Sequence, residues 1–123
     1  MTGYEVVQKA LMRLNYTTPL GDTDNGLNTE HLRRGLEAVN TVLADLQHVA
    51  GVELTQITAL KEELPLDKKV VLLAAVPGVA MHLAQGESDG DSYNRFATEY
   101  EQKRRLAARS HGKVRDVLPW PIG

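Results

Sequence analysis

The sequence contains no cysteine and very few aromatic residues. Without cysteine, disulfides, thiolate metal sites and thiol nucleophiles are excluded together, and synthesis inside a cell fits this absence. Phe and Trp occur once each, so the core must be built from Leu, Val and Ala, which are typical of packed helices rather than of a β-sandwich. We therefore expect one all-α domain, and 123 residues suffice to bury about two thirds of the unfolded chain's surface.

The sequence also lacks the patterns that mark secretion, membrane insertion and common catalytic sites. Glu5, Lys9 and Arg13 interrupt the apolar pattern of the N-terminus, which no signal-peptide core tolerates. No apolar run approaches the ~18 residues that a spanning helix needs. No GxSxG, GxxxxGK[ST] or GxGxxG motif occurs. We expect a protein that is neither secreted by that route nor embedded in a membrane, that is not an enzyme, and that binds no cofactor.

Two amphipathic helices are predicted in the first half of the chain. Apolar residues recur at helical spacing between about Gly3 and Asn15, and Thr2 with Glu5 forms a capping-box pattern. After a turn-rich loop, Asn28 or Thr29 caps a helix that ends near residue 51, with leucines and valines spaced three and four apart. Its length of roughly 33 Å makes it the expected spine of the domain.

The middle of the chain is predicted to be extended and then helical again. The alternating pattern of residues 51–66 suits an extended strand or hairpin arm. Asp67 can then cap a third helix, from Lys68 to about Gln85, which is apolar nearly all round and hence buried on more than one side. Pro77, followed by Gly78, is expected to kink this helix.

A fourth helix and a tail complete the predicted architecture. Ser92 can cap the helix, and its buried side is expected to carry Tyr93, Phe96, Tyr100 and Leu106. Gly112 is expected to end it. The sequence thus predicts a bundle of about four helices over residues 1–112 and an extended C-terminal tail over residues 113–123.

The loop after the first helix resembles the start of a calcium-binding loop, because it holds Asp22, Asp24 and Gly26. A calcium-binding loop has its glycine at the sixth position and a bidentate glutamate at the twelfth. Here Gly26 is fifth and Arg33 is twelfth, counted from Asp22. We therefore interpret the segment as a plain turn and predict no metal site.

The four histidines are far apart in the sequence and form no i, i+4 pair. His82 stands in the apolar third helix, where it can be a buried, hydrogen-bonded imidazole or a ligand. We favour the structural interpretation.

Charge is sorted along the chain. Residues 1–67 hold 5 basic and 10 acidic side chains, whereas residues 68–123 hold 9 and 6. A basic group in the last helix and tail could follow a phosphate backbone, and consists of Lys103, Arg104, Arg105, Arg109, Lys113 and Arg115. An ordinary solvated helix face is the other interpretation, and an isoelectric point near 6.1 makes direct DNA binding the weaker hypothesis.

The tail is apolar although its prolines prevent it from continuing a helix. Its apolar residues are Val117, Leu118, Trp120 and Ile122. Trp is a frequent hot spot at interfaces, and an extended Pro-containing segment loses little entropy when it docks. The tail either anchors a partner or folds back over its own bundle. The candidate partner-binding residues are therefore Arg104, Arg105, Arg109, Lys113 and Arg115 together with these four.

The order of the segments resembles the small helical head-tail connector, or adaptor, proteins of tailed phages. The resemblance covers most of the chain and depends on ALMRLNY in the first helix, GLEAVNTVLADLQHVAG in the second, a short extended segment before LPL, VVLLAAVPGVAMHLA, and YNRFATEYEQKRRLAARS with its Pro-containing tail. The Pro77-Gly78 pair and a tail shorter than in some members depart from the family pattern.

The resemblance implies a structural virion protein with no catalytic residues. Such connectors assemble as rings, typically dodecameric, beneath the portal vertex after DNA packaging. They extend the DNA channel and form a platform for tail or neck proteins, and the DNA passes through without sequence-specific contact. For this chain the resemblance implies that residues 100–123 dock on the portal while neighbouring subunits pack helix against helix. Its location is then the head-tail interface of the virion, and the host cytoplasm during assembly. A DNA-binding regulator using the basic fourth helix and a catalytic or metal-dependent domain using the Asp22 loop remain as alternatives.

Overall fold

The computed structural model describes residues 1–16, 29–50 and 53–116, with side chains described for 1–16, 30–48 and 53–106. The elements in chain order are α1 (Gly3–Leu14), α2 (Thr29–Ala50), α3 (Lys68–Val70), the π-helical turn η1 (Val71–Ala75), α4 (Val76–Gly86) and α5 (Gly90–Asp116). α3, η1 and α4 follow one another without a break, as one helical rod. The all-α prediction is confirmed, and the described residues contain no strand.

α1 has the boundaries and the cap that the sequence predicts. The Glu5 amide donates to the Thr2 hydroxyl at 3.2 Å, and the Thr2 amide donates to the Glu5 carboxylate at 2.9 Å. These two bonds form the capping box. At the other end, Asn15 adopts a left-handed conformation with φ of 63°, which ends the helix.

α2 also has the predicted length, and it crosses α1 closely at a glycine. A Cβ built on Gly35 would lie 2.7 Å from a Val7 methyl carbon. Only a residue without a side chain allows the two backbones to approach this far. The buried face of α2 carries Val39, Val42 and Leu43, as the apolar spacing predicts.

The segment between α2 and α3 is extended, but the predicted strand is wrong for the part described, residues 53–67. Its backbone forms a single isolated bridge, between Thr2 and Glu63. The side chain of Asn40 takes the place of a second strand, because it both donates to the Ile57 carbonyl and accepts from the Ile57 amide, each at 2.9 Å. The N-terminus of the chain accepts a further hydrogen bond from this segment, because the Leu64 amide donates to the Met1 carbonyl at 3.0 Å.

The rod from Lys68 to Gly86 is disturbed where the sequence predicts it, just before Pro77. The Val76 amide bonds to the Val71 carbonyl, five residues back. In an α-helix that amide would bond to Leu72, and Pro77 has no amide to offer Leu73. The proline therefore produces a π-helical turn. The carbonyls that lose their α-helical donors belong to Leu72, which is exposed, and Leu73, which is half-buried. Asp67 stands at the cap position, but its side chain makes no capping hydrogen bond.

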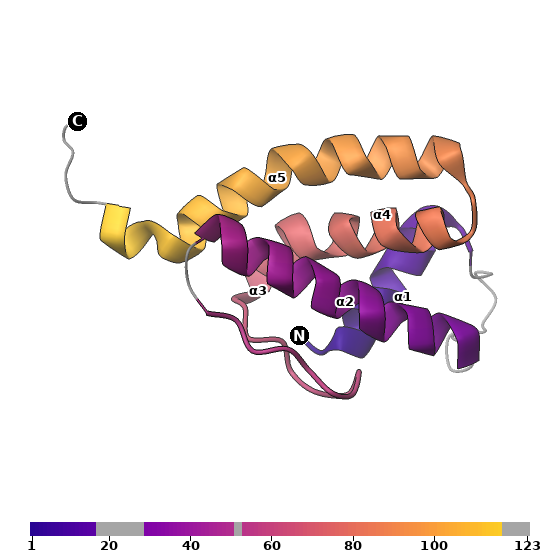
Figure 1. The fold of residues 1–123 in the computed structure, drawn as a ribbon, viewed down its shortest axis with the longest axis horizontal. Coiled ribbons are helices and arrows are strands. Elements are labelled where there is room, and N and C mark those ends of the chain that lie inside the picture. Colours follow the sequence, from indigo (N-terminus) through magenta and orange to yellow (C-terminus); the bar gives the residue numbers. More distant parts are fainter. Residues whose placement is uncertain (17–28, 51–52, 117–123) are drawn as a thin grey trace.

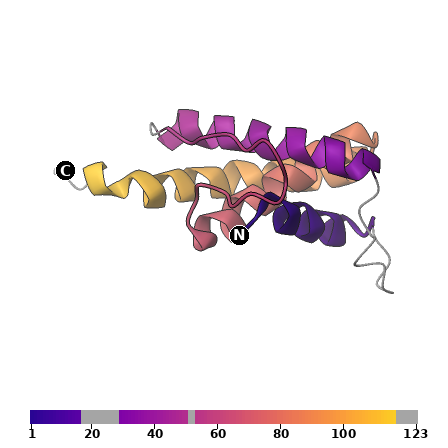
Figure 2. The ribbon, with the colours of Figure 1, turned by 90° about the horizontal axis from the view of Figure 1, so that it is seen from below.

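α4 lies at the centre of the bundle and contacts α1, α2 and α5. Figure 1 shows it between α5 and α2, and the view in Figure 2 shows α2 and α1 on opposite sides of the molecule. The buried residues of α4 are Val76, Pro77, Gly78, Val79, Ala80, Leu83 and Ala84. Burial on several sides is thus confirmed.

By length and composition alone, Lys68–Gly86 could cross a membrane, with a mean hydropathy of 1.4 over 18 residues. The expectation that no run of the sequence reaches this limit is therefore wrong. In the folded chain 61% of that window is buried, so packing against the other helices accounts for its apolar composition.

α5 differs from its prediction at both ends. It starts at Gly90 rather than after Ser92, because Asp89 is the residue whose carboxylate caps it, accepting from the Ser92 amide at 3.2 Å. It continues through Gly112 to Asp116, so the predicted end at Gly112 is wrong and residues 113–116 are helical. Phe96 and Tyr100 are buried as expected, whereas Leu106 is 48% exposed and does not belong to the core.

Candidate partner-binding site

The distal part of α5 extends beyond the rest of the bundle. α5 has 27 residues and the antiparallel rod Lys68–Gly86 has 19, so α5 is longer by 8 residues, or about 12 Å at 1.5 Å per residue. α2 runs beside α5 and ends at Ala50. Both ribbon views show the C-terminal stretch of α5 reaching past the ends of α2 and α3 (Figures 1 and 2). This overhang, residues 109–116, and its base, residues 100–106, are the candidate partner-binding site.

Asp45 joins α2 to α5 at the base of the overhang. Its carboxylate accepts from the Tyr100 hydroxyl at 2.7 Å, and from the Arg104 guanidinium at 2.9 Å through Nε and 3.2 Å through Nη2. The two guanidinium bonds go to different carboxylate oxygens, which is the bidentate geometry that makes such pairs strong. Tyr100 is the last buried residue among the described positions of α5.

The protonation states at this junction favour the ionised pair. Burial raises the pKa of the Asp45 carboxyl, but hydrogen bonds from Arg104 and Tyr100 outweigh that effect, and the pKa lies below its usual 3.8. Burial, with the bond to Asp45, raises the pKa of the Tyr100 hydroxyl far above its usual value. The hydrogen bond to Asp45 raises the pKa of Arg104. At neutral pH the junction therefore holds a carboxylate, a neutral phenol and a cation.

Arg104 and Arg105 occupy different environments although they are neighbours in the sequence. The Arg104 side chain is 20% exposed and is engaged by Asp45, whereas that of Arg105 is 68% exposed. Arg105 contacts only Glu101 among the described residues, at 3.2 Å, one helical turn back. Such exposed pairs contribute little to stability. Arg105 is thus available to a partner, whereas the interpretation of the basic group as a solvated helix face is wrong for Arg104.

The other predicted site residues lie further along. Arg109, Lys113 and Arg115 belong to α5, whose backbone is helical to Asp116, but their side chains fall outside the described residues. Val117, Leu118, Trp120 and Ile122 lie outside the described residues altogether. Leu106 precedes them as an exposed apolar residue that the sequence assigned to the core.

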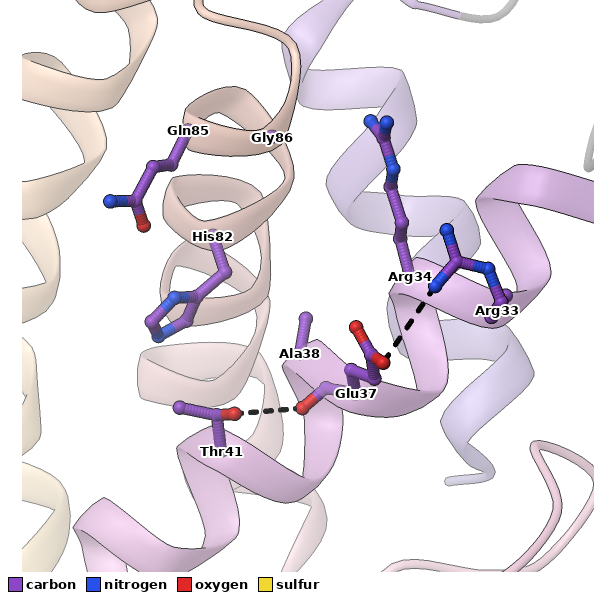
Figure 3. Close-up of a pocket in the computed structure, with 8 residues that line it drawn as sticks. All are labelled: Arg33, Arg34, Glu37, Ala38, Thr41, His82, Gln85 and Gly86. Atoms are coloured by element: carbon purple, nitrogen blue, oxygen red, sulfur yellow. Dashed lines mark hydrogen bonds and ion pairs between the residues drawn. The ribbon is translucent and has the colours of Figure 1, made fainter.

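A second candidate is an open groove over α4 beside α2, with a volume of about 340 Å³. Figure 3 shows His82 and Gln85 extending from α4, with Arg33 and Arg34 on α2. The groove is balanced in charge, because Arg34 pairs with Glu30 at 2.7 Å and with Glu87 at 3.0 Å. It offers no uncompensated cation to an anionic ligand.

His82 is half-buried at this groove. Burial lowers the pKa of its imidazole, although the charge of Asp45 opposes the shift. The imidazole is therefore neutral at neutral pH. Within the described part of the chain, no three His, Asp or Glu side chains are placed to share a metal ion. The Asp22 loop lies outside the described residues.

Sequence reasoning missed Asp45. The residue stands three positions after buried Val42 and one before buried Leu46, so it borders the apolar face of α2. A carboxylate beside an apolar face favours a cationic partner from the neighbouring helix. That signal could have indicated a pair, but not which arginine supplies it.

No protein-family model, no curated protein and no solved structure matches this chain.

Proposed function

We propose that this protein is a structural subunit of a tailed-phage virion, a ring-forming head-tail connector that docks on the portal vertex. In this role it extends the DNA channel and provides the platform for tail attachment. The proposal starts from the resemblance of the segment order and is supported by the shape of the fold.

The observation that carries the proposal is the overhang of α5. A helix end without flanking helices gains little from propensity alone, because isolated helices of this length are marginal in water. Most helical stability in proteins comes from packing of a helix face, and a partner molecule could supply that packing for the overhang. The overhang and its base also carry an exposed cation at Arg105 and an exposed leucine at Leu106. Exposed charge beside apolar surface is the composition of a protein interface rather than of a catalytic cleft.

The sequence after the overhang supports the same use. In the sequence, four apolar residues follow the helix closely: Val117, Leu118, Trp120 and Ile122. An aromatic anchor next to cationic residues is a common arrangement of binding hot spots. We therefore assign portal binding to the overhang and the tail, with a tail or neck protein as the second partner.

The DNA-binding regulator remains the second candidate because α5 is rich in basic residues. Arg104 weakens it, since a guanidinium held by Asp45 is not free to neutralise a phosphate.

Mass measurement of the purified protein, alone and mixed with its portal protein, tests the proposal. A discrete ring or a stoichiometric portal complex is expected. A monomer that does not bind the portal protein but binds duplex DNA, with an affinity that falls steeply as the salt concentration rises, would instead support the DNA-binding regulator.

A further inference from the structure

We infer that Asp45, Tyr100 and Arg104 form a carboxylate clamp that fixes the direction of the α5 overhang, and that opening the clamp frees the overhang while the bundle stays folded. This inference concerns a positioning device and does not depend on the identity of the partner.

The first argument is the change in the kind of contact along α5. Its N-terminal half is attached by apolar packing, with Phe96 1% and Tyr100 6% exposed. After Tyr100, the described residues 101–106 are all exposed or half-buried. The attachment of this stretch to α2 therefore depends on the Arg104 pair with Asp45, rather than on burial of apolar surface.

The second argument is the geometry of the clamp. Asp45 receives three hydrogen bonds from α5, of 2.7, 2.9 and 3.2 Å. Tyr100 and Arg104 are one helical turn apart, so both reach the same carboxylate from one face of α5. A planar guanidinium bound through two nitrogens fixes an angle as well as a distance. The clamp thereby helps to fix the rotation and tilt of α5 where it leaves the bundle, together with the contacts of α5 with η1 and α3.

The third argument concerns the groups around the clamp. The charge of His48, on α2, favours the ionised form of Asp45. The charge of Asp45 in turn favours the protonated form of His82, on α4. Glu101, on α5, contacts Arg104 at 3.5 Å but has a 57% exposed side chain. Asp45 is therefore the carboxylate that positions Arg104, and Glu101 is a secondary, solvent-screened contact.

The clamp lies near the end of α2, where it can act on the angle at which α5 leaves the bundle. It is the described ion pair between α2 and α5, and α2 ends soon after it at Ala50. A small change of angle at the clamp is carried along the continuous helical backbone of α5 toward Asp116. A partner that competes for Arg104 would release the overhang from α2 and allow it to turn toward that partner.

Asp45→Asn tests the clamp, with Glu101→Gln as the matched control. Each variant removes one negative charge that contacts Arg104, but only the first also replaces one of the two Asp45 oxygens that accept from Tyr100 and Arg104 with an NH2 donor. We expect hydrogen exchange at the amides of residues 101–106 to be about tenfold faster or more in Asp45→Asn, while residues 93–100 keep wild-type protection. Glu101→Gln should leave both stretches unchanged.

The opposite results are equally clear. Equal loss of protection along all of α5, failure of Asp45→Asn to fold, or no acceleration in residues 101–106 would each overturn the clamp. Tyr100→Phe adds an independent check, because it keeps the buried ring and removes only the hydroxyl, and it should accelerate the same stretch to a smaller extent.

The direction of the overhang can be measured separately, since a chain without cysteine accepts spin labels at chosen sites. Labels introduced through Thr41→Cys and Ser110→Cys report the distance from α2 to the overhang. We expect a narrow distance distribution in the wild-type background and in Glu101→Gln, and a broader one in Asp45→Asn. Equal widths in the three backgrounds would contradict the inference.

Discussion

Gly78 of α4 and Tyr100 of α5 pack so closely that a Cβ built on Gly78 would lie 2.7 Å from the Tyr100 ring carbon Cε1. The same Cβ would lie 2.9 Å from a methyl carbon of Val42 on α2. Three helices therefore meet at a position that tolerates no side chain. This contact also places the Tyr100 hydroxyl where it can reach Asp45.

Gly78→Ala should destabilise the protein by about 1–3 kcal/mol, because overpacking exceeds the gain of up to ~1 kcal/mol in helix propensity. Chemical denaturation measures the change. Gly90→Ala is the matched control, since a Cβ there meets nothing within 4 Å, and it should be neutral or slightly stabilising. A Gly78→Ala protein as stable as the Gly90→Ala protein would show that the three helices separate easily.

Leu43→Asp should cost several kcal/mol, because Leu43 is 1% exposed on the buried face of α2 and an unpaired carboxylate would enter the core. The neighbouring Ala44 is exposed, so Ala44→Asp should change the melting temperature little. An undiminished melting temperature for Leu43→Asp would mean that the buried face of α2 is wrongly assigned.

Arg104→Glu and Arg105→Glu should separate folding from association. Arg104→Glu places a carboxylate beside Asp45 and should lower the free energy of unfolding by more than ~1 kcal/mol. Arg105→Glu should change it by less than ~0.5 kcal/mol and weaken portal binding instead. Urea denaturation and a portal-binding titration measure the two effects. Equal loss of stability in both variants would refute the distinction.

Acid should lower the free energy of unfolding, partly through protonation of Asp45. The folded pKa of this carboxyl is below its usual 3.8, so its stabilising contribution is present above the unfolded pKa and is lost as the pH falls through the folded pKa. Urea denaturation at about pH 5 and about pH 3 should show a smaller loss of stability in Asp45→Asn than in the wild type. A loss of the same size in both proteins would mean that other carboxyls account for the acid sensitivity.

The helices were predictable because their signals are local. The capping box of Thr2 and Glu5 and the spacing of Val39, Leu43 and Leu46 are contained within one or two turns of sequence. The end of α5 was missed because Gly112 is a weak stop signal, costing only ~1 kcal/mol inside a helix. The cap of α5 was missed for a similar reason, since Asp89 and Ser92 are both good capping residues.

The junction of α2 and α5 could not be predicted from the sequence. Asp45 and Arg104 are 59 positions apart, and the packing of α5 on α4 and α2 brings them together. The strand prediction failed for a related reason, because the partner of Ile57 is a side chain, Asn40, rather than another strand. Long-range polar contacts of this kind leave no periodic pattern.

The measurement that tests the proposed connector role most directly is electron microscopy of purified portal mixed with the full chain and, in parallel, with a chain lacking residues 116–123. The account predicts a ring on the portal with the full chain. It predicts no ring with the shortened chain, because truncating an aromatic hot spot typically costs ~2 kcal/mol or more of binding. The shortened chain itself should remain folded. Equal rings from both chains would reject the tail as the anchor. Bare portals in the presence of a folded full-length chain would contradict the connector function itself.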